Sequence, residues 1–280
     1  MKKSELQRAL TAAVKAARAA GRVMRKNLHA AKKINEESQH DIKLELDVRC
    51  QKLIERLLLA EFPDVSLLGE EGESGEATSE QRWVVDPIDG TVNFAHGMPH
   101  ACVSIALQTR SARRQVPSAR SPKQFTHPAS RVTDYVTVLG VVYDPFTDEL
   151  WTAIRGENAR LNARVIRVSR RRNLEEAIVS IGFSKSKTNL ASSLPYFCRL
   201  ARCARKVRIM GSAALALTYV ATGRFDAYIE RRISLWDIAA GGLILECAGG
   251  SFEARPVAGY HRYGLMASNG VIRKQLSWPK

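Results

Sequence analysis

Hydrophobic residues at the start of the chain follow a helical spacing. Between Leu6 and Leu28, apolar side chains and alanines recur every three or four positions, and Lys and Arg occupy many of the others. This pattern predicts an amphipathic helix that packs on the rest of the protein. Residues 41–47 then alternate strictly between charged and apolar, which is typical of a half-buried strand or of an extended start to the next helix. Helical spacing returns over residues 50–62 and stops before a proline.

Shorter apolar runs predict a series of strands and three more helices. The predicted strands are Val65–Leu68, Trp83–Val85, Cys102–Leu107, Val136–Tyr143, Glu149–Ile154, Ala177–Gly182 and Asp226–Glu230. The predicted helices are Leu190–Ala204, Ala213–Thr222 and Trp236–Ala248. Residues 72–75 contain two glycines and predict a loop. Strands and helices alternate in small groups without a strict βαβ repeat, so the sequence favours a mixed, layered α/β fold over a doubly wound one.

Residues 110–131 form the clearest compositional break. They carry six Lys or Arg, three Pro, several Ser and no acidic residue. A segment of this length without periodicity is unusual inside a compact domain. We therefore expect a basic surface insertion within one catalytic unit that spans residues 1–280. The insertion could contact the phosphates of a nucleic acid, or it could be a solvated segment.

Composition narrows the class of protein. The chain has 280 residues, of which 45% are hydrophobic, so it can bury a sizeable core. It lacks the roughly 18 consecutive apolar residues of a membrane span, and Glu5 and Arg8 interrupt any signal peptide. Five scattered cysteines without a C-x-x-C pair fit a reducing compartment. These features predict a cytoplasmic protein that has no membrane partner.

The formal charge of +15 is open to three interpretations. It could attract a polyanion such as nucleic acid, it could attract a small phosphorylated substrate, or it could simply make the surface basic and soluble.

The chemistry centres on the hexapeptide of residues 86–91, DPIDGT. Asp86 and Asp89 stand three positions apart directly after a predicted strand, with the Ile88 carbonyl between them. Oxygen ligands of this kind suit Mg²⁺ when positions remain for water and phosphate. If Thr91 begins a helix, the N–H groups at its start suit an anionic phosphate, and Gly90 allows a close approach. The alternative is a plain turn, because Asp-Pro and Asp-Gly are common turn formers.

Two more acidic positions favour the metal site. Glu70 and Glu71 end a predicted strand just upstream. Asp237 stands at the start of a predicted helix, where its spacing from Ser234 is also that of a capping box.

These clusters together resemble the inositol monophosphatase family of Mg²⁺-dependent, lithium-sensitive phosphatases. Residues 83–94 (WVVDPIDGTVNF) are similar to the first motif of the family, and residues 236–250 (WDIAAG to AGG) are similar to the second. Gly69–Glu71 and Gly211–Ala214 add two shorter matches in the right order. The likeness runs from the N-terminal helix to about Ser268 and leaves out the insertion. It implies a layered αβαβα sandwich of the inositol monophosphatase and fructose-1,6-bisphosphatase type.

The resemblance also implies roles for single residues. The groups that would hold two or three Mg²⁺ ions are Glu70, Asp86, the Ile88 carbonyl, Asp89 and Asp237. The residues that would act in catalysis by orienting water and accepting its proton are Glu70, Thr91 and Asp47, of which Asp47 would hydrogen-bond Thr91. The residues that would contact the phosphate or the hydroxyl groups of the substrate are Asp89, Gly90, Thr91, Ala213, Glu230 and Asp237. One departure is Lys43, where many relatives have a small polar or apolar residue, and it puts a third metal ion in question.

The resulting hypothesis is a Mg²⁺-dependent phosphomonoesterase for a small polyol phosphate, above all myo-inositol monophosphate, and the resemblance implies a homodimer. Sugar bisphosphates, 3′-phosphonucleotides and NADP are alternative substrates. A hypothesis of another class is a basic protein that binds nucleic acid or an acidic partner on the same scaffold.

Overall fold

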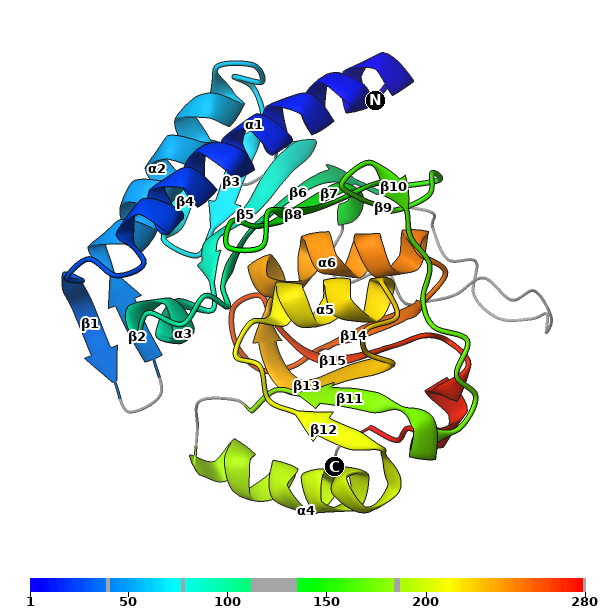
Figure 1. Ribbon diagram of the computed structural model, residues 1–280. Helices are drawn as coiled ribbons and strands as arrows, with labels where there is room; N and C mark the ends of the chain where they lie inside the picture. The colour runs from blue at the N-terminus through cyan, green and yellow to red at the C-terminus, as the bar shows by residue number, and fades with distance from the viewer. Residues whose placement is uncertain (39–40, 77–78, 112–134, 184–186, 279–280) are drawn as a thin grey trace.

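The polypeptide forms five layers of helix and sheet, shown in Figure 1. The computed structural model describes residues 1–38, 41–76, 79–111, 135–183 and 187–278. The layers begin with α1 (Lys3–Asn27) and α2 (Glu45–Leu59), which cover an eight-stranded sheet. On the other side of that sheet lie α5 (Ala213–Ala221) and α6 (Leu235–Cys247), followed by a five-stranded sheet and α4 (Lys187–Cys203). The predicted order αβαβα is confirmed.

Each helix layer has its own hydrophobic cluster. The cluster under α1 and α2 joins them to the eight-stranded sheet, the middle one surrounds α5 and α6, and the third joins α4 to the five-stranded sheet. The buried face of α1 consists of alanines, Gly21 and Met24. These small side chains let α1 lie very close to the sheet, since a Cβ atom on Gly21 would stand 2.6 Å from the ring of Tyr143.

The eight-stranded sheet has the order β10-β9-β8-β7-β6-β5-β3-β4. Its strands are β3 (Ser66–Gly69), β4 (Gly72–Ser74), β5 (Gln81–Asp89), β6 (Cys102–Arg110), β7 (Tyr135–Asp144), β8 (Glu149–Ile154), β9 (Arg160–Leu161) and β10 (Arg164–Val165). Only β3 and β5 pair in parallel. The prediction of a loop over residues 72–75 is wrong for β4, which pairs with β3 as a short hairpin. The strand is polar and lies at the edge of the sheet, so no apolar alternation marks it.

A separate hairpin precedes α2. It consists of β1 (Ile34–Ser38) and β2 (Asp41–Leu44), and α2 begins at the next residue. The predicted extended conformation of residues 41–47 is confirmed for residues 41–44, and it is wrong for residues 45–47, which already belong to α2.

The five-stranded sheet has the order β12-β11-β13-β15-β14. Its strands are β11 (Ile178–Ile181), β12 (Lys206–Arg208), β13 (Ala227–Ser234), β14 (Ser251–Pro256) and β15 (Arg262–Ser268). Strand β11 runs parallel to β12 and β13, whereas β15 runs antiparallel to β13 and β14. The short elements α3 (Thr91–Ala95), η2 (Leu174–Glu176) and η3 (Ile272–Gln275) complete the described fold.

The expected insertion of residues 110–131 lies almost wholly outside the described residues. Arg110 at the end of β6 pairs with Tyr135 at the start of β7. Among the described helices, none is both long and apolar enough to cross a membrane.

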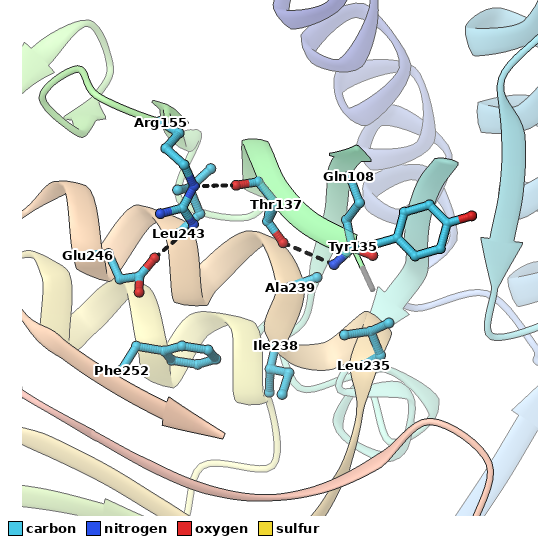
Figure 2. A pocket seen from close by; sticks show the side chains of 10 residues that line it. All are labelled: Gln108, Tyr135, Thr137, Arg155, Leu235, Ile238, Ala239, Leu243, Glu246 and Phe252. Atoms are coloured by element: carbon cyan, nitrogen blue, oxygen red, sulfur yellow. Dashed lines mark hydrogen bonds and ion pairs between the residues drawn. The ribbon is translucent and has the colours of Figure 1, made fainter. Parts of the chain in front are cut away.

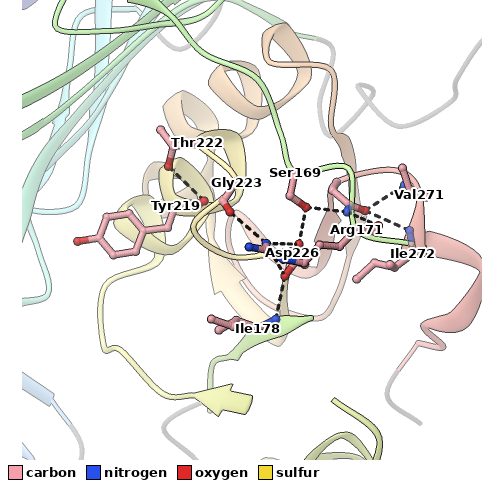
Figure 3. Close-up of polar contacts among 10 residues, drawn as sticks. Ser169, Arg171, Ile178, Tyr219, Thr222, Gly223, Asp226, Val271 and Ile272 are labelled. Atoms are coloured by element: carbon pink, nitrogen blue, oxygen red, sulfur yellow. Dashed lines mark hydrogen bonds and ion pairs between the residues drawn. The ribbon is translucent and has the colours of Figure 1, made fainter. Parts of the chain in front are cut away.

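A buried carboxylate ties the second sheet to the segment that leads into it, as Figure 3 shows. Asp226 is fully buried just before β13. It accepts hydrogen bonds from the hydroxyl of Ser169, from Nη1 of Arg171 at 3.0 Å and from the N–H of Ile178 at 2.8 Å. Asn269, which follows β15, donates to the Ser169 hydroxyl at 3.0 Å. The carboxylate thus joins the ends of β11, β13 and β15 to residues 169–171.

We expect Asp226→Ala to destabilise the protein more than Arg171→Gln does. Removing the carboxylate leaves the partly buried N–H of Ile178 without its acceptor, which costs about 1–3 kcal/mol in addition to the lost ion pair. Arg171→Gln keeps the Ser169 and Ile178 donors on the carboxylate, and the side chain of Arg171 is 40% exposed, so water can take its place and we expect a smaller loss. Urea unfolding of the two variants measures the difference, and equal losses would contradict this assignment.

Candidate metal centre

A bulge in β5 places two aspartates on the same face of the sheet. Asp86 lies opposite Ser104 of β6 and Asp89 lies opposite Cys102, with an irregularity between them. Two residues of β5 therefore face one residue of β6. In a regular strand, residues three positions apart point to opposite faces, so the extra residue is what turns both carboxylates toward the α5 and α6 layer. Pro87 lies within the bulge, where a missing N–H does not break the ladder.

The parallel pairing of β3 with β5 brings Glu70 beside Asp86. Gly69 pairs with Val85, and the N–H of Glu70 donates to the Val85 carbonyl at 3.1 Å. Gln51 of α2 holds the turn that follows, because it accepts from the N–H of Glu71 at 2.9 Å and donates to the Gly72 carbonyl at 3.0 Å. A Cβ atom on Gly69 would stand 2.2 Å from Oε1 of Gln51, so a larger residue would displace this side chain from the turn.

Asp237 reaches the same place from the first turn of α6. Its Oδ2 accepts the N–H of Ser234 at 2.9 Å, so the predicted capping role is real. Asp237 also joins Glu70 and Asp86, and one carboxylate oxygen from each lies within 4.8 Å of the others. The Asp237 side chain therefore both caps α6 and belongs to the acidic cluster.

Asp89 is fixed by the start of α5. Its carboxylate accepts from the Ser212 hydroxyl at 2.6 Å, from the N–H of Ala214 at 2.7 Å and from the N–H of Ala213 at 3.2 Å. These are the N–H groups that a helix leaves without an internal acceptor. The helix start thus holds Asp89 in its ionised form and in one orientation.

The electrostatics of the cluster call for a cation. Burial, followed by the charges of Glu70, Asp89 and Asp237, raises the pKa of Asp86 well above its usual range. Burial, followed by the charge of Asp237, raises the pKa of Asp89 to about 6, although the hydrogen bonds from Ser212, Ala214 and Ala213 oppose this shift. Carboxylates that repel one another in a buried site are stabilised by a bound metal ion. An all-oxygen donor set fits a hard cation such as Mg²⁺.

Gly90 and Thr91 of the motif follow Asp89 directly, at the end of β5 and the start of α3. Gly90 has a φ of 96°, and α3 begins at Thr91 as the sequence predicts. A Cβ atom on Gly90 would stand 2.9 Å from the carbonyl oxygen of His100, so this position is restricted to glycine for space as well as for conformation. The hydroxyl of Thr91 donates to the Ile88 carbonyl at 2.9 Å, which leaves that oxygen a second lone pair.

Asp47 lies at the start of α2. It is buried in the first turn of α2, where Oδ2 accepts the N–H of Leu44 at 2.7 Å. A hydroxyl has one proton, and that of Thr91 is directed at Ile88 in this structure. The hydrogen bond between Asp47 and Thr91 therefore stays a prediction. The side chain of Lys43 lies outside the described part of the structure.

The two predicted substrate contacts lie near the cluster. Ala213 starts α5, and its N–H is directed at Asp89. Glu230 of β13 accepts a hydrogen bond from Tyr228, whose pKa is raised well above its usual value by burial and then by the charges of Glu230, Asp89 and Asp237. Tyr228 is therefore close enough to Glu230, Asp89 and Asp237 for their charges to act on it. That either residue contacts substrate stays a prediction.

Sequence reasoning gave no role to Asn93, which links the two halves of the site. Its Nδ2 donates to the carbonyl of His100 at 2.9 Å and to the carbonyl of Met210 at 2.8 Å. Met210 precedes the Gly211–Ser212 turn that leads into α5 and holds Asp89. The motif itself contained Asn93, but no local pattern indicates a bond to a residue more than a hundred positions away. Gln51 was missed for the same reason.

A hollow beside α6 is not part of this site. Figure 2 shows it between α6 and the exposed ends of β6 and β7, where Arg155 bridges the Thr137 carbonyl at 2.7 Å and Glu246 at 2.9 Å. Its volume of about 30 Å³ holds about two water molecules and no organic substrate. No residue of the acidic cluster lines it.

We expect the stabilising effect of Mg²⁺ to depend on pH. A carboxyl group whose pKa is higher in the folded chain takes up a proton on folding, so the metal-free protein loses stability as the pH rises from about 4 toward the Asp89 pKa of about 6. Mg²⁺ needs the ionised carboxylates and should therefore stabilise at neutral pH, by about 2.7 kcal/mol at 100 times its Kd, and much less near pH 5. Thermal unfolding with Mg²⁺ or EDTA at both pH values measures this, and an equal effect at both would contradict the site.

Replacing Asn93 by Ala should loosen both halves of the site. Two partly buried carbonyls lose their donor, so we expect a loss of about 1–3 kcal/mol in unfolding free energy. Asn27→Ala is the matched control, because Asn27 also donates to a backbone carbonyl, that of Val23 in the same helix, at 2.7 Å. Urea unfolding and Mg²⁺ titration calorimetry should show that only Asn93→Ala also weakens Mg²⁺ binding; unchanged Mg²⁺ affinity would rule out the positioning role.

Comparison with known proteins agrees with this geometry. A family model described as the inositol monophosphatase family matches residues 5–116 and 132–275. Nus factor SuhB from Xylella fastidiosa is 38% identical over 240 residues, which cover 85% of this chain and 78% of that relative. Inositol monophosphatase 1 from Solanum lycopersicum is 34% identical over 252 residues, which cover 88% of this chain and 84% of that relative.

A solved structure shows the same fold. The inositol monophosphatase from Anabaena superposes with a TM-score of 0.77 and 33% sequence identity, and the match covers 97% of this chain and 94% of that one. The model match spans most of the chain, and the acidic motifs of the family gather at one place in this structure. The chain belongs to the inositol monophosphatase family.

Proposed function

We propose that the protein is a Mg²⁺-dependent phosphomonoesterase that hydrolyses a small polyol phosphate, with myo-inositol monophosphate as the first substrate to test. The observation that supports this most is the meeting of Glu70, Asp86 and Asp237 within 4.8 Å of one another beside the starts of α5 and α6. A cytoplasmic location, predicted from the composition, and a homodimer, implied by the family resemblance, belong to the same proposal.

Each group of the site has a chemical task in this proposal. Glu70, Asp86, the Ile88 carbonyl, Asp89 and Asp237 would hold two or three Mg²⁺ ions. When bound, Mg²⁺ supplies positive charge for the phosphate oxygens and makes water a better nucleophile at neutral pH.

The remaining residues would handle the water, the phosphate and the alcohol. Thr91 would orient the attacking water, and Glu70 or Asp47 would accept its proton. The turn at Gly90 lets the phosphate approach the backbone at the start of α3. Ala213 and Glu230 would fix the hydroxyl groups of the polyol, so that the leaving oxygen lies in line with the attacking water.

Other phosphate esters are alternatives to inositol monophosphate. Sugar bisphosphates, 3′-phosphonucleotides and NADP present the same phosphate to the cluster and differ only in the group that meets Glu230 and Ala213. A second candidate function is a binding role beside catalysis. It is favoured by the relative that is named a Nus factor and by the exposed basic residues at the end of α4 in this chain.

Asp86→Asn tests the metal assignment with little risk to the fold. The asparagine keeps an oxygen for the N–H of Ile88, at 3.0 Å from Oδ1, and removes one repelling charge, so the variant should fold at least as stably as the wild type. We expect phosphate release to fall by about 100-fold or more. Asp89 is a less clean choice, because an amide there would face the donors of Ser212 and Ala214.

Asp144→Asn is the matched control. Asp144 is also a buried aspartate that accepts the N–H of the residue two positions on, that of Phe146 at 2.8 Å, and it lies outside the cluster. Phosphate release is measured with inositol 1-phosphate, fructose 1,6-bisphosphate, 3′-phosphoadenosine 5′-phosphate and NADP, with Mg²⁺ and with EDTA. The proposal fails if the folded wild type releases no phosphate from any of them, or if Asp86→Asn and Asp144→Asn behave alike.

A further inference from the structure

The proposed activity gives no function to one strongly basic part of the chain, between Glu176 and Asp226. Between Glu176 and Asp226 the sequence has no acidic residue and eight Lys or Arg. Five of these eight gather within ten positions, at the end of α4 and on β12: Arg199, Arg202, Arg205, Lys206 and Arg208. All five are exposed. We call this set the α4–β12 basic edge.

The position of β12 makes this edge an open surface. The strand is the outermost of the five-stranded sheet and pairs only with β11 among the described strands. Val207 packs with the cluster under α4, so its two neighbours, Lys206 and Arg208, point together to the other face of the strand. Figure 1 shows α4 and β12 at the side of the molecule opposite to α1 and α2.

Some basic residues elsewhere in the chain have acidic partners, whereas others, such as Arg22, Arg25 and Lys26 on α1, have no ion pair among the described residues. Arg155 pairs with Glu246, Arg224 with Glu149 and Arg18 with Asp148. Within the described part of the chain, no member of the α4–β12 basic edge takes part in an ion pair. Arg199 donates instead to the hydroxyl of Ser277 at 2.9 Å. Like charges this close repel one another, so the arrangement costs stability unless something compensates.

Two structural reasons account for parts of this edge only. A basic residue in the last turn of a helix is favoured by the helix dipole, which explains Arg202. Charged residues on an edge strand prevent strand-to-strand aggregation, which explains why Lys206 and Arg208 are charged. An acidic residue at either position would give the same protection, so this reason does not explain the positive sign. Neither reason explains why five positions have the same sign.

We propose that the α4–β12 basic edge binds the sugar-phosphate backbone of a single-stranded nucleic acid. Four of its five residues are arginines, whose planar guanidinium groups bind phosphate through two parallel hydrogen bonds. Ile209, directly after β12, is 57% exposed and offers an apolar surface to an unstacked base, which a duplex keeps covered. The inference does not depend on the phosphatase activity.

The test is binding of a labelled oligouridylate RNA of about 15 nucleotides to the full-length protein, followed by fluorescence anisotropy over a range of KCl concentrations. We expect R202Q/R205Q/K206Q to lower the affinity about tenfold or more near 100 mM KCl. The slope of log K against log salt should fall by about 2, since each phosphate contact on a single strand contributes about 0.7. Oligothymidylate in parallel tests the same backbone chemistry with deoxyribose, and binding of either strand supports the proposal.

The matched control is R22Q/R25Q/K26Q on α1. It also removes two Arg and one Lys from five consecutive positions, all of them exposed, so it changes the net charge equally on the other side of the molecule. We expect its affinity to stay within about twofold of the wild type. Circular dichroism and thermal unfolding confirm that both variants are folded, and the double variant R205Q/K206Q provides a milder change that should show a smaller loss in the same direction.

Three results of the binding experiments would overturn the proposal, and the phosphatase assay adds a fourth. They are absence of RNA and DNA binding by the wild type, equal losses in the two triple variants, and displacement of RNA by polyglutamate as effectively as by unlabelled RNA, which would indicate an acidic protein partner. Phosphate release from inositol 1-phosphate, measured on the same samples, should be the same in R202Q/R205Q/K206Q as in the wild type. Loss of RNA binding with normal turnover supports the proposal, whereas loss of turnover with normal RNA binding would assign the edge to substrate attraction and contradict it.

Discussion

Repulsion among buried carboxylates is the constraint on which the arrangement of the site depends. The pKa values of Asp86 and Asp89 are raised by burial and then by the charges of the other carboxylates close to them. Left to themselves, such groups would move apart or take up protons. The structure prevents movement through contacts that are independent of the charges, namely the bulge in β5, the parallel pairing of β3 and the capping of α6 by Asp237. The repulsion between the carboxylates therefore remains at the site, where a bound cation can neutralise it.

The middle helix layer, α5 and α6, connects the carboxylates of the site to the hydrophobic core between the two sheets. Helices α5 and α6 both begin at the site, and their bodies lie in the hydrophobic cluster between the two sheets. Asp89 comes from the first sheet and is held by α5, whereas Asp237 belongs to α6, which follows directly on β13 of the second sheet. Asn93 adds a direct bond between the motif helix and the turn before α5. Packing of the core therefore sets the distances between the carboxylates, and a cavity in that layer would change metal binding without touching a ligand.

The sequence was sufficient for the elements that have strong apolar periodicity and for the acidic motifs. It could not show why Asp86 and Asp89 point to the same face, because that depends on a bulge whose extra residue has no signature beyond Pro87. Strand β4 was taken for a loop, and β1, β9, β10, β12, β14 and β15 were not identified. Most of these strands are short or polar, so no apolar alternation marks them, whereas the buried strand β15 was missed despite its apolar residues. Gln51 and Asn93 act through contacts that only the folded chain creates. For these two residues the missing information is long-range contact, which local pattern does not contain.

The distribution of positive charge separates structural carboxylates from those that bind a ligand. Asp226 is as deeply buried as Asp86, yet it has Arg171 as a partner, and Glu149, Glu246 and Glu253 each have an arginine as well. The described contacts of Asp86 and Asp89 are with backbone N–H groups, Ser212, Cys102 and other acids, with no basic side chain among them. Among the described residues, therefore, the basic side chains have other partners or none, and these two aspartates are left to each other and to a cation. A lysine beside Asp86 and Asp89 would neutralise the carboxylates permanently and occupy the volume that a metal and a phosphate need. The excess charge of +15 is compatible with an acidic site because the described contacts of Asp86 and Asp89 include no basic side chain.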